Sequence, residues 1–167
     1  PYDIAVAEGH KDAELLKALA TPEALRAAVT SGDKDSVEAL LAAGMDPNSS
    51  TEGGSNLLND AVKAGNADVV AALIAAGANV NSVDEDGDTA LCKAADLGSK
   101  EMVALLLDNG ADVNGRDRSG RTALHRAAKT PSLDVVSMLC ERGADTKAKD
   151  NEGATPLHAG AAAGSVP

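Results

Sequence analysis

Residues 117–128 read DRSGRTALHRAA, and residues 84–95, which lie 33 positions earlier, read DEDGDTALCKAA. A third copy begins at residue 150 with DNEGATPLH. The same spacing extends to earlier residues, and its markers are Leu58, Leu91, Leu124 and Leu157, with Gly54, Gly87, Gly120 and Gly153. A fixed period of this size is typical of a repeat protein, whose units stack on their neighbours and build an extended surface.

Each copy carries the signals of two helices and a turn. A threonine precedes each first helix, where its side chain can cap the unpaired N–H groups of the first turn. These residues are Thr89, Thr122 and Thr155. An apolar stripe, such as residues 102–107, predicts the second helix. A glycine suited to a left-handed helix end follows the stripe, at Gly77, Gly110 and Gly143. The Asp-x-x-Gly pattern before each threonine is typical of a tight turn.

These copies resemble the ankyrin repeat, whose hallmark is a T-P-L-H helix start. Residues 155–158 read TPLH, residues 122–125 TALH and residues 89–92 TALC, and GADVN at 110–114 agrees with the second half of that repeat. The resemblance covers nearly the whole chain. It implies an all-α repeat solenoid, an ankyrin array of stacked helix-turn-helix units with projecting β-hairpin loops. The predicted repeats are 21–50 (without a full leading hairpin), 51–83, 84–116 and 117–149, with partial repeats at 1–20 and 150–167.

Some copies depart from this pattern. Residues 55–59 read SNLLN, a degraded helix start, whereas Thr21 and Pro22 provide a helix start with proline in the first turn. Pro131 stands where Gly65 and Gly98 stand in earlier copies. We expect it to distort or rigidify the turn between the two helices of its repeat. The partial repeats at both ends favour a segment of a longer chain.

The composition favours thin stacked layers. The chain has 167 residues, of which 44% are hydrophobic, and Tyr2 is its one aromatic residue. No apolar run is long enough to cross a membrane, so we expect no membrane contact within this segment. Cys92 and Cys140 occupy positions expected to lie in the core as buried thiols. Unpaired thiols indicate a reducing intracellular compartment, the cytoplasm or the nucleus.

The net charge of −11 is unevenly distributed. Residues 115–149 hold eight basic and four acidic side chains, a net charge of +4, and residues 150–167 add −2, which leaves −13 for the first 114 residues. Such polarity can orient a charged partner. The alternative is that these are solvated faces that keep the protein soluble. We predict no nucleic-acid binding, because the chain is acidic and has no aromatic stacking platform.

No motif predicts catalysis. The sequence lacks C-x-x-C, H-E-x-x-H, a phosphate-binding loop and a G-x-S-x-G turn. The acidic loop 84–88 lacks the distal glutamate of an EF-hand. His125 and His158 occupy one repeat position, and the resemblance implies that this histidine ties the helix start to a neighbouring turn. We therefore predict that the chain is not an enzyme and that it holds no metal and no cofactor.

The resemblance implies that another protein is bound by the hairpin tips and by the inner face of the first helices. The partner-binding residues predicted from these positions are Lys63, Glu85, Asp86, Asp88, Lys93, Asp96, Arg118, Arg121, Arg126 and Lys129. We expect that neutralising Arg121, Arg126 and Lys129 together weakens binding without unfolding the array. The leading hypothesis is a non-catalytic scaffold or adaptor. The alternatives are a regulatory or targeting segment of a larger enzyme or channel and a structural subunit of a large assembly.

Two asparagines end the G-A-[ND]-V-N segments, Asn81 and Asn114. Their surroundings resemble the site that an oxygen-sensing asparaginyl hydroxylase modifies in animal ankyrin repeats. The alternative, which we favour, is that these side chains stabilise the hairpin through hydrogen bonds to the backbone.

Overall fold

A computed structural model describes residues 20–49 and 55–164 of the chain. The chain divides after residue 79 into two compact units. All regular elements of the described residues are α-helices, which confirms the predicted all-α repeat solenoid. The partial repeat predicted at 1–20 falls outside the described residues except for Ala20.

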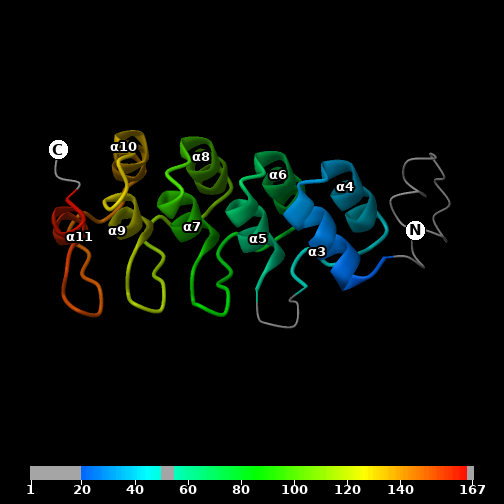
Figure 1. The fold of residues 1–167 in the computed structure, drawn as a ribbon, viewed down its shortest axis with the longest axis horizontal. Helices are drawn as coiled ribbons and strands as arrows, with labels where there is room; N and C mark the ends of the chain where they lie inside the picture. Colours follow the sequence, from blue (N-terminus) through cyan, green and yellow to red (C-terminus); the bar gives the residue numbers. More distant parts are fainter. Residues whose placement is uncertain (1–19, 50–54, 165–167) are drawn as a thin grey trace. The chain divides into compact units, whose positions relative to one another are not determined.

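In its described residues, 20–49 and 55–79, the first unit contains two helix pairs (Figure 1). Their bounds are α3 Pro22–Ser31 and α4 Lys34–Ala42, then α5 Leu57–Ala64 and α6 Ala67–Ala75. The two first helices, α3 and α5, pack against each other, and so do the two second helices, α4 and α6. α3 begins where the sequence predicts, because the Oγ1 of Thr21 accepts the N–H of Ala24 at 3.1 Å and Pro22 fills the first turn.

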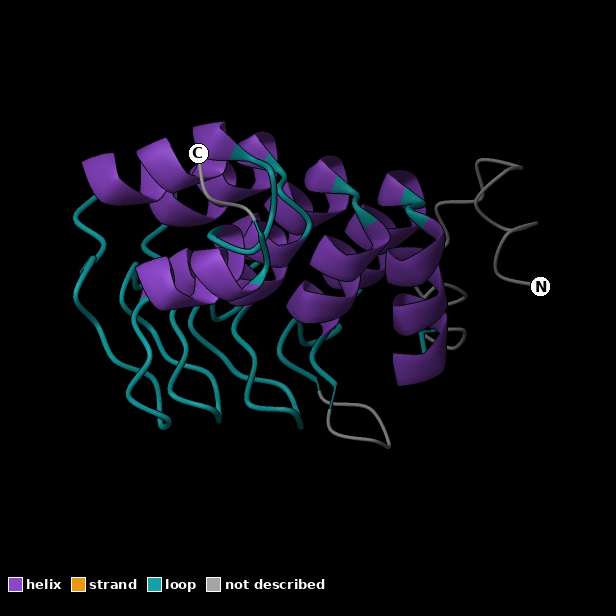
Figure 2. Ribbon diagram, turned by 60° about the vertical axis from the view of Figure 1, so that its left-hand side comes forward, coloured by secondary structure: helices purple, strands orange, loops and turns teal. Residues whose placement is uncertain are grey.

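The second unit continues the same plan. Its helices are α7 Ala90–Asp96, α8 Lys100–Asp108, α9 Ala123–Ala127, α10 Leu133–Glu141 and α11 Pro156–Ala162. The first helices α7, α9 and α11 pack in one row, and the second helices α8 and α10 form another (Figure 1). The loops before α7, α9 and α11 project together away from the second helices, as Figure 2 shows.

Aliphatic side chains at the predicted repeat positions form the core. Leu58, Leu91 and Leu124 are at most 3% exposed, and the valine–leucine stripe of each second helix is buried beside them. Small residues let the first helices approach closely. A methyl group added at Gly160 of α11 would lie 3.0 Å from the carbonyl oxygen of Ala128, a backbone atom that cannot move aside. The burial of these leucines and valines confirms the predicted apolar faces of the helices.

The projecting loops of the second unit are built on aspartate turns. Oδ1 of Asp84 accepts the backbone N–H groups of Asp86 and Asp88, at 3.1 and 2.9 Å, and Asp117 and Asp150 repeat this pattern 33 and 66 residues later. Gly87 completes the turn with φ of 76°, which a side chain would strain. Each of the first two loops closes with a single antiparallel bridge, Val83 with Thr89 and Arg116 with Thr122, so each is a minimal hairpin.

The first helix of the repeat that carries Pro131 is shorter than its counterpart, which agrees with the distorted turn that the sequence predicts. Helix α9 has five residues, whereas α7 has seven. In the α7 repeat, the chain leaves the helix through Gly98, whose φ is 64°. Proline cannot adopt a positive φ, so the chain turns earlier. The Oγ1 of Thr130 donates to the carbonyl of Ala127 at 2.9 Å and satisfies a carbonyl at the shortened end.

The two cysteines have different environments. Cys92 is buried on α7, as predicted. The prediction for Cys140 is wrong, because this residue is exposed on α10. The face of α10 that packs inward is formed by Val135 and Leu139, both with no exposed surface. Cys140 lies beside that face, on a flank that no described element covers.

Candidate partner-binding surface

The predicted binding residues fall into two groups by their exposure. Six are exposed: Lys63 on α5 of the first unit, and Glu85, Asp86, Asp96, Arg118 and Lys129 in the second. Four others are half-buried between the loops and the first helices: Asp88, Lys93, Arg121 and Arg126. The half-buried charges have partners within the chain.

Arg126 of α9 is the centre of a charge cluster. Its Nη2 lies 2.6 Å from Oδ1 of Asp88, its Nη1 lies 2.6 Å from Oδ2 of Asp96, and its Nε donates to Asp117 at 3.1 Å. Asp88 and Asp96 belong to the preceding repeat, whereas Asp117 precedes α9 in its own repeat. One guanidinium, whose side chain is 20% exposed, thus ties two repeats together.

The electrostatics of Arg126 favour its charged form. Partial burial acts to lower the pKa of Arg126, but the hydrogen bond to Asp117 and the charges of Asp96 and Asp88 outweigh that effect, so its pKa is raised. The carboxyl group of Asp117 is 1% exposed. Without the guanidinium, this carboxylate would be a buried charge with no cation beside it, which is costly.

Lys93 occupies the position of Arg126 one repeat earlier, and its acidic partners Asp84 and Asp88 belong to its own repeat. Its Nζ lies 2.8 Å from Asp84 and 3.3 Å from Asp88. Partial burial acts to lower the pKa of Lys93, but the hydrogen bond to Asp84 and the two acidic charges raise it overall. Asp88 therefore contacts two cations, and the loop 84–88 is fixed to both α7 and α9.

Neighbouring loops are also tied to each other directly. Arg121 Nε lies 3.5 Å from Asp150, and the backbone N–H of Asn151 donates to the carbonyl of Ser119 at 3.0 Å. A methyl group added at Gly87 would lie 2.9 Å from Cβ of Arg118. The three loop tips are thus held at a fixed spacing.

His125 joins the start of its helix to a turn of the next repeat, as the resemblance implies. Its Nδ1 accepts the N–H of Thr122 at 3.2 Å, and its Nε2 lies 3.1 Å from the carbonyl oxygen of Ala154 in the next repeat. Cys92 occupies the same position one repeat earlier, and its Sγ lies 4.0 Å from the carbonyl of Arg121. This sulfur contact is weak, and burial raises the pKa of the Cys92 thiol.

The asparagines at the ends of the G-A-[ND]-V-N segments also join repeats. Asn81 Nδ2 donates to the carbonyl of Gly110 at 3.0 Å, and its Oδ1 accepts the N–H of Asp112 at 2.7 Å. Asn114 makes the same pair of bonds 33 residues later, to Gly143 and Asp145. These side chains bond the backbone, as favoured, but the bonds reach the next repeat rather than their own hairpin. In the following repeat, Lys147 occupies the position of Asn81 and Asn114, so the series of asparagines stops there.

The structure changes one expectation about the binding residues. Neutralising Arg126 removes the cation shared by three carboxylates, so we expect this change to destabilise the second unit. Sequence reasoning missed this because the repeat period gives each residue a position within its repeat and does not show which side chains meet across repeats. The available signal was an arginine at a repeat position that otherwise holds Asp60, Lys93 and Ala159.

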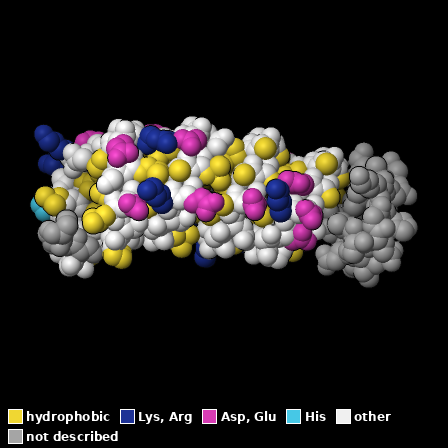
Figure 3. All heavy atoms as spheres, turned by 90° about the horizontal axis from the view of Figure 1, so that it is seen from above, with side chains coloured by type: hydrophobic (Ala, Val, Ile, Leu, Met, Phe, Trp, Pro, Cys, Tyr) yellow, Lys and Arg dark blue, Asp and Glu magenta, His cyan; other side chains and the backbone are white. Residues whose placement is uncertain are grey.

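The described residues include no group of three or more histidine, cysteine or acidic side chains that could hold a metal ion. Among the same residues, none of the helices is long and apolar enough to cross a membrane. The face of the second unit built by α8 and α10 mixes acidic, basic and apolar side chains (Figure 3).

Stacked helix pairs, aspartate turns and hydrogen bonds that recur every 33 residues define a helical repeat protein. The family model for ankyrin repeats (3 copies) matches residues 3–84, 24–117, 58–150 and 114–167, so the chain belongs to the ankyrin repeat family. Ankyrin repeats are generally protein–protein interaction modules. No curated protein matches the chain.

Proposed function

We propose that this chain is a non-catalytic scaffold or adaptor module that binds a protein partner through its loop tips and the inner face of its first helices. The observation that carries the proposal is the difference between the two groups of charged residues. Arg126 joins two repeats and Lys93 fixes the loop of its own repeat, whereas Glu85, Asp86 and Arg118 at the tips are exposed.

The tips vary on a constant frame, which is what a binding surface requires. The turn-forming aspartate and glycine are identical in the loops at 84–88, 117–121 and 150–154. Between them lie the pairs Glu85–Asp86, Arg118–Ser119 and Asn151–Glu152. The loops at 117–121 and 150–154 are hydrogen-bonded to each other, and ion pairs fix the loop at 84–88 to α7 and α9, so little conformational entropy is lost when a partner docks.

The order of charges along the tips suggests how a partner would align. An acidic pair is followed by Arg118 in the next loop, so the partner would present a basic group before an acidic one. Lys129 lies in the turn after α9 rather than on that helix, and since it is exposed it would contribute to the same contact. Arg126, Lys93 and Asp88 act as positioning residues in this proposal, because they fix the loops. Lys63 on α5 is a candidate contact of the first unit.

The two unpaired cysteines support an intracellular site of action, in the cytoplasm or the nucleus. Exposed Cys140 in particular would be oxidised readily outside a reducing compartment.

The proposal can be tested with two charge-matched variants in quantitative affinity capture from cells that produce the protein. The tip variant carries Glu85→Lys, Asp86→Lys and Arg118→Glu. The control carries Glu101→Lys, Lys100→Glu and Asp134→Lys on α8 and α10. The last two substitutions reverse an exposed ion pair, in which Nζ of Lys100 lies 3.8 Å from Oδ2 of Asp134. Both variants change the net charge by the same amount.

We expect a partner that the wild type and the control retain and that the tip variant loses. If the tip variant retained the same partners in the same amounts, the tips would not be the binding surface. Circular dichroism would verify that both variants are folded.

A further inference from the structure

Two neighbouring loops of the second unit carry basic side chains that form no ion pair with any residue the structure describes. The basic side chains that do pair with an aspartate in this unit are Lys93, Lys100, Arg121, Arg126 and Arg142. The unpaired cations, which we call the basic strip, are Arg116 and Arg118 before α9 and Lys147 and Lys149 before α11.

Hydrogen bonds hold these two loops side by side, so the four cations belong to one surface. Nη1 of Arg116 donates to the carbonyl of Lys149 at 2.6 Å, and Nδ2 of Asn151 donates to the carbonyl of Arg118 at 3.1 Å. Both loops project from the helices in the same direction (Figure 2). The carbonyl groups that Arg116 contacts have no net charge, so its positive charge is not neutralised.

The acidic side chains of the same loops offset this charge only in part. Asp117 and Asp150, at the centres of the turns, are buried and paired with Arg126 and Arg121. Three exposed acids remain beside the four cations, and they are Asp112, Asp145 and Glu152. The two exposed aspartates each accept a backbone N–H of their own turn at 2.9 Å. The surface is therefore positive on a chain whose net charge is −11.

The strip occupies positions that are exposed in every described copy of the loop. Val83, Arg116 and Lys149 share one repeat position, and all three are exposed, Val83 at 53%. Asn114, the counterpart of Lys147, is exposed as well. Val83 and Asn114 belong to repeats with a further repeat packed beside them. A neighbouring repeat thus leaves these positions open to solvent.

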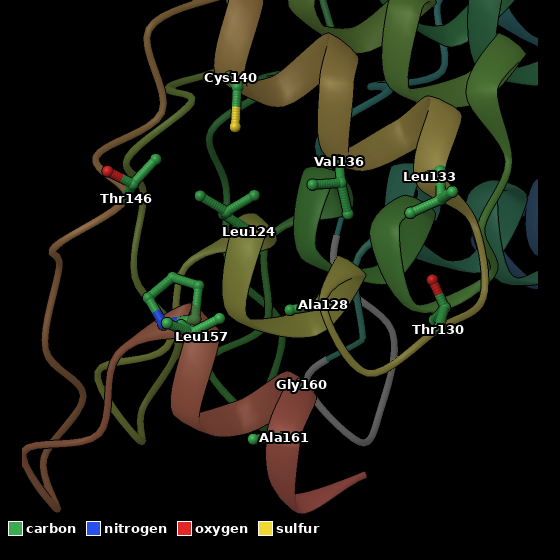
Figure 4. A pocket seen from close by; sticks show the side chains of 11 residues that line it. Leu124, Ala128, Thr130, Leu133, Val136, Cys140, Thr146, Leu157, Gly160 and Ala161 are labelled. Atoms are coloured by element: carbon green, nitrogen blue, oxygen red, sulfur yellow. The ribbon is translucent and has the colours of Figure 1, made fainter. Parts of the chain in front are cut away.

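The apolar groove between α10 and α11 differs in this respect (Figure 4). Leu157 in the groove is 73% exposed, whereas its counterparts Leu124 and Leu91 are 3% and 2% exposed where a second helix packs beside them. The groove is the place that a second helix of the array takes in this fold, so it indicates no partner of another kind.

Lys147 replaces an asparagine that joins repeats in the preceding copies. Asn114 accepts the N–H of Asp145 through its Oδ1 at 2.8 Å. A lysine ammonium group has three donors and no acceptor, so Lys147 cannot reproduce this bond. The repeat gives up a stabilising contact and gains an exposed positive charge, which is the exchange expected where a surface serves binding.

We propose that the basic strip binds a short acidic segment of a partner protein, rich in aspartate or glutamate. A short segment fits better than a nucleic acid, because the first 114 residues carry a charge of −13 that repels a long polyanion. The strip adds a contact beside the loop tips and shares Arg118 with them. It does not depend on the tip contact, since the other three cations lie outside the tips.

The probe is a fluorescein-labelled peptide of eight glutamates, added to the whole chain at low salt. We expect saturable fluorescence anisotropy with a Kd below about 1 mM. Binding should weaken as salt is added, because exposed charges are screened. A peptide of eight glutamines, which has the same length and no side-chain charge, should not bind.

The strip itself is tested by Lys147→Gln and Lys149→Gln in one protein. Both side chains are exposed and form no ion pair, so the variant should fold, and circular dichroism verifies that. Binding should weaken about fivefold, the scale of two exposed ion pairs. The strip variant retains every tip residue, so failure of the tip contact would leave this result unchanged.

The matched control carries Lys100→Gln and Arg142→Gln. It removes the same charge from the ion pairs with Asp134 and Asp108, which lie on the second helices and not on the loops. We expect it to change binding by less than about twofold.

The proposal would be overturned by a glutamate peptide that does not bind or by equal weakening in the strip variant and the control. The last test compares the peptide with a fluorescein-labelled oligonucleotide of eight thymidines. Tighter binding of the oligonucleotide, lost in the strip variant, would assign the strip to a nucleic acid instead. Weaker binding of the oligonucleotide than of the peptide is the result we expect.

Discussion

Two charged regions of the second unit differ in what their side chains contact. Around Arg126, acidic and basic groups from consecutive repeats meet at 2.6–3.3 Å, and all of them except exposed Asp96 are buried or half-buried. At the loop tips, Glu85, Asp86 and Arg118 are exposed. The sequence predicts partner contacts in both regions. The difference shows that a charge on the inner face can serve the array itself, so the position in the repeat alone does not identify a contact residue.

The largest expected effect on stability comes from a substitution at Arg126, the centre of the half-buried charge cluster. Arg126→Met keeps an apolar side chain but removes the cation shared by Asp88, Asp96 and Asp117. We expect a loss of about 2–3 kcal/mol in the free energy of unfolding, because one partner of a partly buried cluster is removed and some solvent screening remains. Urea unfolding followed by circular dichroism measures it.

The matched control for this change is Arg118→Met at a tip. It should alter the free energy of unfolding by less than about 0.5 kcal/mol, as surface substitutions usually do. Equal losses for the two variants would remove the distinction between the inner charges and the tip charges.

A smaller effect separates two histidines at the same repeat position. His125 is 1% exposed and reaches Ala154 of the next repeat, whereas His158 is exposed and bonds Thr155 within its own repeat. We expect His125→Ala to cost about 2 kcal/mol, since it leaves a cavity and unpaired polar groups, and His158→Ala to cost less than about 1 kcal/mol. Urea midpoints compare them, and similar losses would show that the bond between repeats contributes nothing.

The smallest expected effect comes from adding a hydrogen bond between repeats at the position that His125 and His158 occupy in later repeats. Cys92→His should place a ring where His125 lies one repeat later, with bonds to the N–H of Thr89 and the carbonyl of Arg121. We expect stability to rise by about 1 kcal/mol, the usual net contribution of a hydrogen bond. Thermal unfolding measures the change. A decrease in Tm would mean that the α7 repeat has no room for the ring.

The sequence period predicted most of the fold, because caps, turns and apolar stripes act locally. Thr21, Thr89 and Thr122 begin helices, and the glycines after each second helix have positive φ. The period also predicted that Pro131 would disturb its turn. Cys140 was placed wrongly, since its burial depends on what covers a flank of α10 and not on the pattern within that helix.

The candidate site was less predictable for a related reason. Arg126 bonds residues that lie 9, 30 and 38 positions away in the sequence. A long side chain reaches neighbours in several directions, and the period does not select among them. The asparagine ties from Asn81 and Asn114 were expected within their hairpins for the same reason, and the structure places them between repeats.

The most direct test of the account is a double-mutant cycle between Arg126→Met and Asp88→Ala, measured by urea unfolding. The two residues belong to consecutive repeats, so their coupling energy reports the tie between repeats and excludes effects of either residue alone. The account predicts a favourable coupling of at least about 1 kcal/mol. Additive losses, within about 0.3 kcal/mol, would contradict the claim that the inner charges hold the repeats together.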